Sequence, residues 1–112
     1  MFQEIYVIEE KEELTKELKE LFKNQGNLRF RKTSTSELQL IFRNLPQLII
    51  INDDSIEENT VEICKKIREN EDNNIIPIIV LASNEDKQFK IDLAMNYVEY
   101  YIAKSMGTEY LY

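Results

Sequence analysis

The chain has 112 residues, 43% of them hydrophobic, and contains only two glycines and two prolines. This composition fits one compact domain over residues 1–112 and argues against linkers or low-complexity segments. Fourteen Lys and Arg residues against 21 Asp and Glu residues give a net charge of -7, so we expect this domain to bind neither nucleic acid nor membranes by itself.

The sequence contains no histidine and a single cysteine, Cys64. The lack of histidine excludes a catalytic triad, a histidine metal site and a phosphohistidine within the chain. A lone cysteine excludes an internal disulfide and is typical of a reducing compartment. No run of about 18 apolar residues is present, and the N-terminus lacks a signal-peptide pattern. We therefore expect a soluble cytoplasmic domain with Cys64 in its core.

The first half of the chain predicts two strands and two helices. An apolar run at 5–8 predicts a buried strand. Residues 11–23 carry leucines and a phenylalanine at helical spacing, which predicts an amphipathic helix. Residues 28–31 alternate apolar and basic side chains, which is typical of a half-exposed edge strand. Ser34 and Glu37 have capping-box spacing and introduce a second helix. The predicted inward residues of that helix are Leu38, Ile41, Phe42 and Leu45.

The second half predicts three more strands and two more helices. The most apolar segment, 48–51, follows Pro46 and ends in polar residues 52–54, which is typical of a central parallel strand buried on both faces. Further strands are predicted at 78–81 and 99–103, and helices at 59–70 and 85–96. The predicted inward residues of these helices are Thr60, Ile63, Cys64, Ile67, Phe89, Leu93 and Ala94.

Strands that alternate with helices of this length predict an α/β fold, a doubly wound five-stranded parallel sheet with helices on both faces. Residues 105–112 could only begin a fifth helix, so we expect that helix to be short or truncated. In such folds ligands bind at the carboxyl ends of the strands, where functional side chains are therefore expected. The polar residues at those ends are Glu9, Glu10, Asn52, Asp53 and Lys104.

Carboxylates beside one ammonium group are suited to a divalent cation and a phosphoryl group. With this pattern the chain resembles the receiver domain of two-component response regulators, the CheY-like family. The segments that carry the resemblance are IYVIEE, PQLIIIN, NTVEICKKIREN, IPIIVLAS and YYIAKS, and together they span nearly the whole chain. The resemblance implies a phosphorelay signalling module rather than an enzyme. It also implies a histidine kinase or an output domain as partner, and homodimers as one mode of action.

By this match Asn52 falls on the phosphoacceptor aspartate and Ala82 on the family's Thr or Ser. Lys104 falls on the family's lysine, and Tyr101 on the aromatic residue whose rotamer reports activation. A carboxamide carries no charge, so Asn52 should not accept a phosphoryl group. Ala82 lacks the hydroxyl, and the neighbouring Ser83 is expected to face the opposite side of its strand. The leading hypothesis is a pseudo-receiver that acts through protein contacts without phosphorylation.

Two alternatives remain open. A phosphoaccepting receiver would use Asp53, or less readily Asp54, with Mg²⁺ at Glu9 and Glu10. A flavodoxin-type small-ligand domain would need a phosphate loop rich in Gly, Ser or Thr after the first strand, where this chain has EEKEEL.

An amide at position 52 removes one negative charge from the cation site, so we expect at best weak Mg²⁺ binding by Glu9, Glu10 and Asp53, and no other cofactor. The resting pocket is expected to be held by Lys104, bonded to Asn52 or paired with Glu9 or Glu10.

Aromatic side chains on the last helix and strand commonly mark interfaces. In receivers this face makes dimers and contacts output domains. The surface around Phe89, Tyr100 and Tyr101 is therefore the predicted partner interface.

Overall fold

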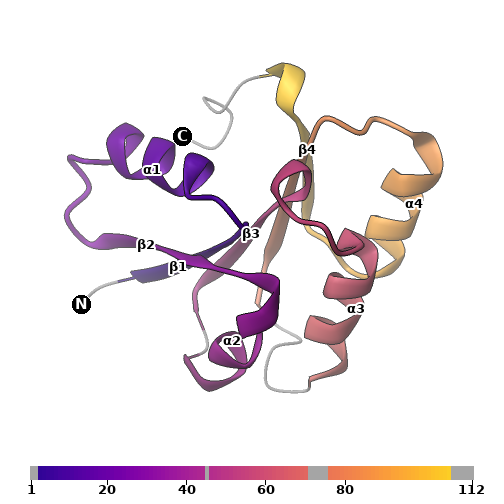
Figure 1. Ribbon diagram of the computed structural model, residues 1–112, viewed down its shortest axis with the longest axis horizontal. Helices are drawn as coiled ribbons and strands as arrows, with labels where there is room; N and C mark the ends of the chain where they lie inside the picture. The colour runs from indigo at the N-terminus through magenta and orange to yellow at the C-terminus, as the bar shows by residue number, and fades with distance from the viewer. Residues whose placement is uncertain (1–2, 45, 71–75, 107–112) are drawn as a thin grey trace.

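The computed structural model describes residues 3–44, 46–70 and 76–106. Five strands form one parallel sheet in the order β2-β1-β3-β4-β5 (Figure 1). Their bounds are β1 Gln3–Ile8, β2 Leu28–Thr33, β3 Leu48–Asn52, β4 Ile78–Ala82 and β5 Tyr100–Ala103. The predicted α/β fold with a five-stranded parallel sheet is confirmed, and the predicted edge strand is β2.

Four α-helices connect the strands: α1 Glu13–Leu21, α2 Gln39–Asn44, α3 Thr60–Glu69 and α4 Lys87–Met95. Short 3-10 turns, η1 Thr35–Glu37, η2 Asp53–Ser55 and η4 Lys104–Met106, lie between them or after β5. The predicted capping box of Ser34 and Glu37 is present, but it opens η1 rather than the α-helix itself. No helix among the described residues is long and apolar enough to cross a membrane.

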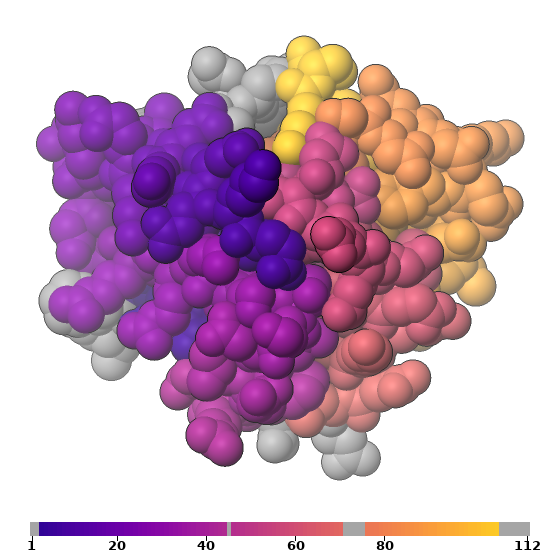
Figure 2. Space-filling model, viewed as in Figure 1, coloured from indigo at the N-terminus to yellow at the C-terminus, as the bar shows by residue number. Residues whose placement is uncertain are grey.

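The two faces of the sheet carry separate cores. On one face, Leu14 and Leu18 of α1 pack over Val7 and Ile50. On the other face, helices α2, α3 and α4 pack over the alternate side chains of the same strands. The buried residues on this second face include Tyr6, Ile8, Ile41, Ile49, Ile51, Ile63, Ile67 and Leu93. Helices therefore cover both faces, and β3 is buried on both sides as its apolar run predicts. Figure 2 shows the α1–β2 half and the α3–α4 half as separate sectors of one surface.

The predicted inward faces hold with one exception. The predicted side of α3, including Cys64, is buried. On α4, Leu93 is buried and Phe89 is half-buried, but Ala94 is exposed, so its predicted inward position is wrong. Successive helical residues are rotated by about 100°, which turns the residue after Leu93 away from the sheet. Leu45 and the predicted fifth helix lie outside the described residues.

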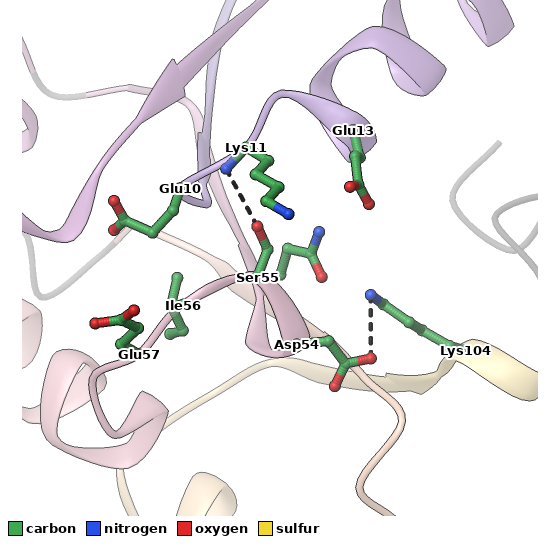
Figure 3. Close-up of a pocket in the computed structure, with 9 residues that line it drawn as sticks. Glu10, Lys11, Glu13, Asp54, Ser55, Ile56, Glu57 and Lys104 are labelled. Carbon is green, nitrogen blue, oxygen red and sulfur yellow. Dashed lines mark hydrogen bonds and ion pairs between the residues drawn. The ribbon is translucent and has the colours of Figure 1, made fainter.

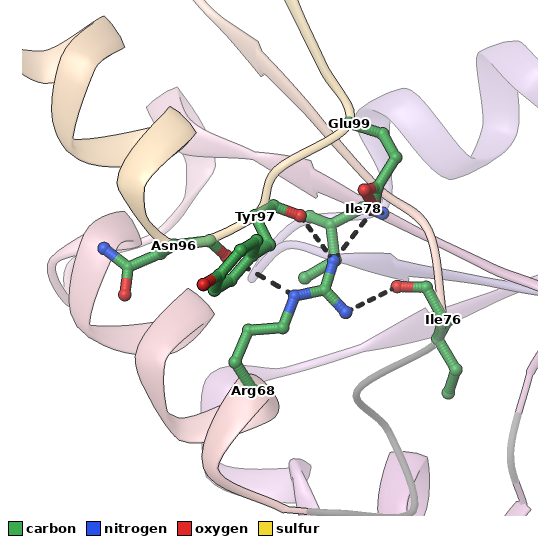
Figure 4. Close-up of polar contacts among 6 residues, drawn as sticks. All are labelled: Arg68, Ile76, Ile78, Asn96, Tyr97 and Glu99. Atoms are coloured by element: carbon green, nitrogen blue, oxygen red, sulfur yellow. Dashed lines mark hydrogen bonds and ion pairs between the residues drawn. The ribbon is translucent and has the colours of Figure 1, made fainter.

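Arg68 of α3 braces the amino edge of the sheet (Figure 4). Its guanidinium donates to the carbonyl oxygens of Ile76 at 2.8 Å and Tyr97 at 2.6 Å. It also pairs with the Glu99 carboxylate at 2.9 Å, and that carboxylate accepts a hydrogen bond from the Ile78 amide. Tyr97, with φ 59°, lies in the left-handed region just after α4. A single side chain thus holds the end of α4 and the starts of β4 and β5 together.

Candidate functional site at the carboxyl ends of the strands

A pocket of about 280 Å³ opens at the carboxyl edge of the sheet (Figure 3). Its walls come from the loop after β1, the turn η2 after β3, and the residues that follow β5. The lining residues are Glu10, Lys11, Glu13, Asn52, Asp54, Ser55, Ile56, Glu57 and Lys104. Three predicted site residues meet here: Glu10, Asn52 and Lys104. Glu9 and Asp53 do not line the pocket.

Glu9 is fully buried and caps α1. One of its carboxylate oxygens accepts hydrogen bonds from the Leu14 amide at 3.1 Å and the Asn52 side chain at 2.9 Å. The other accepts from the Thr15 amide at 2.7 Å and the Thr15 hydroxyl at 2.6 Å. A carboxylate at a helix N-terminus is stabilised by the helix dipole and the free amides there. Each oxygen has two donors, so both of its lone pairs are already used.

Asn52 is the donor that completes this arrangement. It is 3% exposed at the end of β3, and its Nδ2 group points to Glu9 because only the amide nitrogen can donate to a carboxylate. Its Oδ1 atom is buried and has no hydrogen-bond partner among the described residues. A carboxylate at this position could not make the same bond while ionised. Asn52 therefore has a structural role that an aspartate would not fill.

Asp54 is the carboxylate that meets Lys104. The two side chains form an ion pair at 3.1 Å, and the Ser83 hydroxyl and amide both donate to Asp54. Burial of Asp54 opposes ionisation, but the hydrogen bonds from Ser83 and Lys104 outweigh it and lower the pKa of the carboxyl. The expected partners of Lys104, namely Asn52, Glu9 or Glu10, are thus wrong. The turn η2 redirects the chain after Asn52 and brings Asp54 to the end of β5.

Ser83 lies one residue beyond β4, which ends at Ala82. The strand alternation that predicted Ser83 on the side opposite to Ala82 no longer applies there, and its hydroxyl donates to Asp54. Ala82 itself is fully buried. A hydroxyl therefore does bond a carboxylate that is itself paired with a lysine. It comes from the residue after the one that the family pattern marks.

Asp53 and Glu10 are each bound to a neighbouring loop. The Asp53 carboxylate accepts a hydrogen bond from the hydroxyl of Thr60, the first residue of α3. Glu10 is exposed and accepts from the amide and the hydroxyl of Thr35, at 3.1 and 3.0 Å. Within the described part of the chain, no three Asp, Glu, Cys or His side chains are grouped so as to hold one metal ion.

Tyr101 is half-buried on the α4 side of β5. Its ring makes an edge-on contact with Phe89, with centroids 6.3 Å apart, and its hydroxyl donates to the Asn84 carbonyl at 2.6 Å. Burial, followed by the negative charges of nearby acidic residues, raises the pKa of its phenol. Tyr100 is 66% exposed, and strand alternation places it on the opposite face of the sheet. The three predicted interface residues therefore form a pair and a separate tyrosine.

Sequence reasoning did not single out three exposed apolar side chains on α4 and just after it, Ile91, Met95 and Tyr97. Ile91 and Met95 are four residues apart on α4, so the i, i+4 rule could have found them as an outward pair.

Comparison with known proteins gives one related sequence and many related folds. No protein-family model matches the chain. The chain is 29% identical over 105 residues to Histidine kinase P4 of Formosa agariphila. This match covers 94% of the chain but only 8% of the length of that relative.

Solved receiver structures superpose on almost the entire chain. The signal receiver domain of a two-component histidine kinase from Clostridium thermocellum has a TM-score of 0.82 and 23% identity, covering 99% of this chain and 92% of that one. A DNA-binding response regulator of the LuxR family from Staphylococcus aureus has a TM-score of 0.79 and 18% identity, covering 98% and 92%. The chemotaxis response regulator CheY4 of Vibrio cholerae has a TM-score of 0.73 and 10% identity, covering 93% and 88%. The chain therefore has the CheY-like fold of response-regulator receiver domains.

Proposed function

We propose that this chain is a receiver-like module of two-component signalling that acts through protein contacts and is not phosphorylated at Asn52. The observation that carries the proposal is the buried Asn52 amide, which donates to Glu9 at 2.9 Å. The chain is related in sequence to a histidine kinase and similar in fold to response regulators, which supports a kinase or an output domain as its protein partner. We place the module in the cytoplasm, where such partners exchange signals, and assign it no enzymatic activity.

The chemistry of the acceptor position supports this proposal. Formation of an acyl phosphate needs a carboxylate nucleophile, and an amide has no negative charge to attack phosphorus. The Asn52 nitrogen is already engaged by Glu9, and its oxygen is buried. Ala82 offers no hydroxyl, and the charge of Lys104 is already balanced by Asp54. A phosphoryl group at Asn52 would therefore meet no nucleophile, and it would have to share Lys104 with Asp54.

A second candidate function is a phosphoaccepting receiver that uses Asp54. The observation in its favour is the contact of the Asp54 carboxylate with Lys104 and Ser83 at the mouth of the pocket. In this reaction a carboxylate oxygen attacks phosphorus, the bond to the donor breaks, and the leaving group departs with its electron pair. Lys104 would then neutralise the new phosphoryl oxygens. Asp53, the acceptor first suggested by the sequence, is bound to Thr60 and lies outside the pocket lining.

The predicted Mg²⁺ ligands are not gathered at one point. Glu9 has no lone pair left and Asp53 is bound to Thr60. The carboxylates in the pocket lining are those of Glu10, Glu13, Asp54 and Glu57. Such a set of exposed carboxylates suits weak binding of a hard cation, which would neutralise charge on a phosphoryl group. A flavodoxin-type site receives little support, because Glu10 and Glu13 place carboxylates where a phosphate loop would be.

Intact mass after incubation with acetyl phosphate and Mg²⁺ tests these readings. We expect no added phosphoryl group on the wild-type chain, with a phosphoaccepting receiver domain as the positive control in the same reaction. A phosphoryl group that appears on the wild type and is lost in Asp54→Ala, but not in Asp53→Ala, would establish the second function instead. Loss only in Asp53→Ala would restore the acceptor suggested by the sequence.

A further inference from the structure

Positive charge is concentrated at the amino edge of the sheet, at the opposite end of the strands from the site pocket. Lys19 of α1, Lys23 just after it, and Arg29 and Arg31 of β2 line a surface groove of about 370 Å³, here called the basic groove. Among the described residues of this lining, Glu4 is the one that is acidic. Four basic residues against one acidic residue is a reversal of the balance of the whole chain, whose net charge is -7. The groove therefore offers a local attraction for anions on an acidic protein.

The floor of the basic groove is apolar. Phe22 and Phe30 pack there with ring centroids 5.5 Å apart, and the half-buried Leu28 adjoins them. Lys19 and Lys23 stand above this floor on the helix side. Lys23 forms an exposed ion pair with Glu20, and pairs of that kind contribute little. A ligand that fits both features carries carboxylates and apolar side chains together.

The groove lies along an open strand edge. β2 pairs with β1 through Leu28 to Thr33, and no further strand lies beyond it among the described residues. Its side chains alternate: Phe30 belongs to the α1 side, whereas the Arg31 guanidinium lies 5.9 Å from the Tyr6 ring on the other side. An extended segment added to this edge would alternate in the same way, presenting side chains to both walls.

We infer that the basic groove and the adjoining edge of β2 bind an extended acidic segment of a partner protein, one in which carboxylates alternate with apolar residues. Strand pairing would supply backbone hydrogen bonds, and the lysines and arginines would select the charge. Nucleic acid fits less well because the rest of the surface is acidic. A membrane fits less well because the aromatic rings lie on the floor of a concave groove. This inference goes beyond the proposed function and involves no residue of the site pocket.

The inference is tested by fluorescence anisotropy with the full chain. The probe is a fluorescein-labelled peptide of eight residues in which glutamate and leucine alternate. We expect saturable binding that weakens as NaCl is raised. The double variant Lys19→Glu/Lys23→Glu should bind about tenfold more weakly, because each exposed ion pair accounts for roughly two- to fivefold in affinity. The matched control is Lys65→Glu/Lys66→Glu on α3, which changes the net charge equally but lies away from the groove. It should bind as the wild type does.

Equal weakening in both double variants would show that only the overall charge matters, and would overturn the inference. So would a wild type that binds anionic vesicles or single-stranded RNA but not the peptide. Backbone amide chemical shifts locate the contact directly: changes on peptide addition should fall within residues 19–33. Changes at the site pocket instead would refute the assignment, and this readout needs no variant to fold.

Discussion

The bond between Asn52 and Glu9 makes a strong prediction about Asn52→Asp, the change that would restore a family-like acceptor. The new carboxylate would lie in a site that is 3% exposed, against a carboxylate that already caps α1. It would lose the hydrogen bond from Nδ2 and add a second negative charge. The substitution should therefore destabilise the folded protein at neutral pH.

The size of this effect follows from the geometry. A lost hydrogen bond to a charged group accounts for about 1.5–3 kcal/mol. Two like charges about 4 Å apart repel by roughly 4 kcal/mol at the effective dielectric constant near 20 that suits proteins. Relaxation and water entry reduce the sum, so we expect a loss of about 3–4 kcal/mol. That is a large share of the about 5–15 kcal/mol by which domains are stable.

Urea denaturation at pH 8 without divalent cations measures this loss, and the midpoint should fall by about 2 M. Burial and the Glu9 charge would raise the pKa of the new carboxyl above its unfolded value near 4. The new carboxyl therefore causes no loss of stability at a pH where it is protonated in both states. The loss appears as pH rises from the carboxyl's pKa in the unfolded chain towards its higher pKa in the folded protein. The difference in urea midpoint between the variant and the wild type should accordingly be smaller at about pH 4.5. It should also be smaller in excess Mg²⁺, because the cation offsets negative charge.

Asn59→Asp is the matched control, since Asn59 is an exposed N-cap that accepts a hydrogen bond from the Glu62 amide at 3.1 Å. An aspartate caps a helix as well as an asparagine, so stability should change by less than about 0.5 kcal/mol. If the position 52 variant denatured at the wild-type midpoint at pH 8, the donor role assigned to Asn52 would be refuted.

Three further predictions follow from other contacts. Arg68→Ala should lower the free energy of unfolding by about 3 kcal/mol, because it removes a largely buried guanidinium that bonds two carbonyl groups and Glu99. Arg68→Lys should recover little of this loss, because an ammonium group lacks the planar fork of donors. Thermal denaturation measures the loss, and a value below about 1 kcal/mol would contradict the bracing role. Burial raises the pKa of Cys64 to about 12, so the native protein should not react with a thiol reagent at pH 8. The urea-unfolded chain should react under the same conditions. Rapid labelling of the native protein would contradict the core position of Cys64. The lowered pKa of Asp54 means that its stabilising contacts are present above the ordinary aspartate pKa and are lost as pH falls through the folded value. Carbon NMR titration should show that pKa rising in Lys104→Ala, and an unchanged value would exclude Lys104 as a cause.

The sequence predicted the features that depend on local pattern. The run 48–51 has the composition of a strand buried on both faces, and β3 is one. The spacing of Ser34 and Glu37 predicted a capping box, which is present. Such signals need only neighbouring residues, because periodicity and capping act within one element.

The site was predicted only in outline because its contacts depend on where the chain turns. Strand alternation predicted the wrong side for Ser83 because β4 ends at Ala82, one residue earlier. Likewise, the turn η2 places Asp54 rather than Asp53 against Lys104. The two adjacent glutamates could not be told apart by sequence either. The signal that could have identified Glu9 as a cap is its position five and six residues before a leucine and a threonine of the predicted helix.

The buried pair of Glu9 and Asn52 also bears on how such a domain could change over evolutionary time. A single substitution that restores an acceptor at position 52 first produces a less stable protein, because Glu9 has been committed to the amide. The way back needs a second, compensating change at Glu9 or in the first turn of α1. A change from aspartate to asparagine at this position is then easier than the reverse change, which needs two substitutions. The amide is entrenched by its neighbour, whatever selection acts on signalling itself.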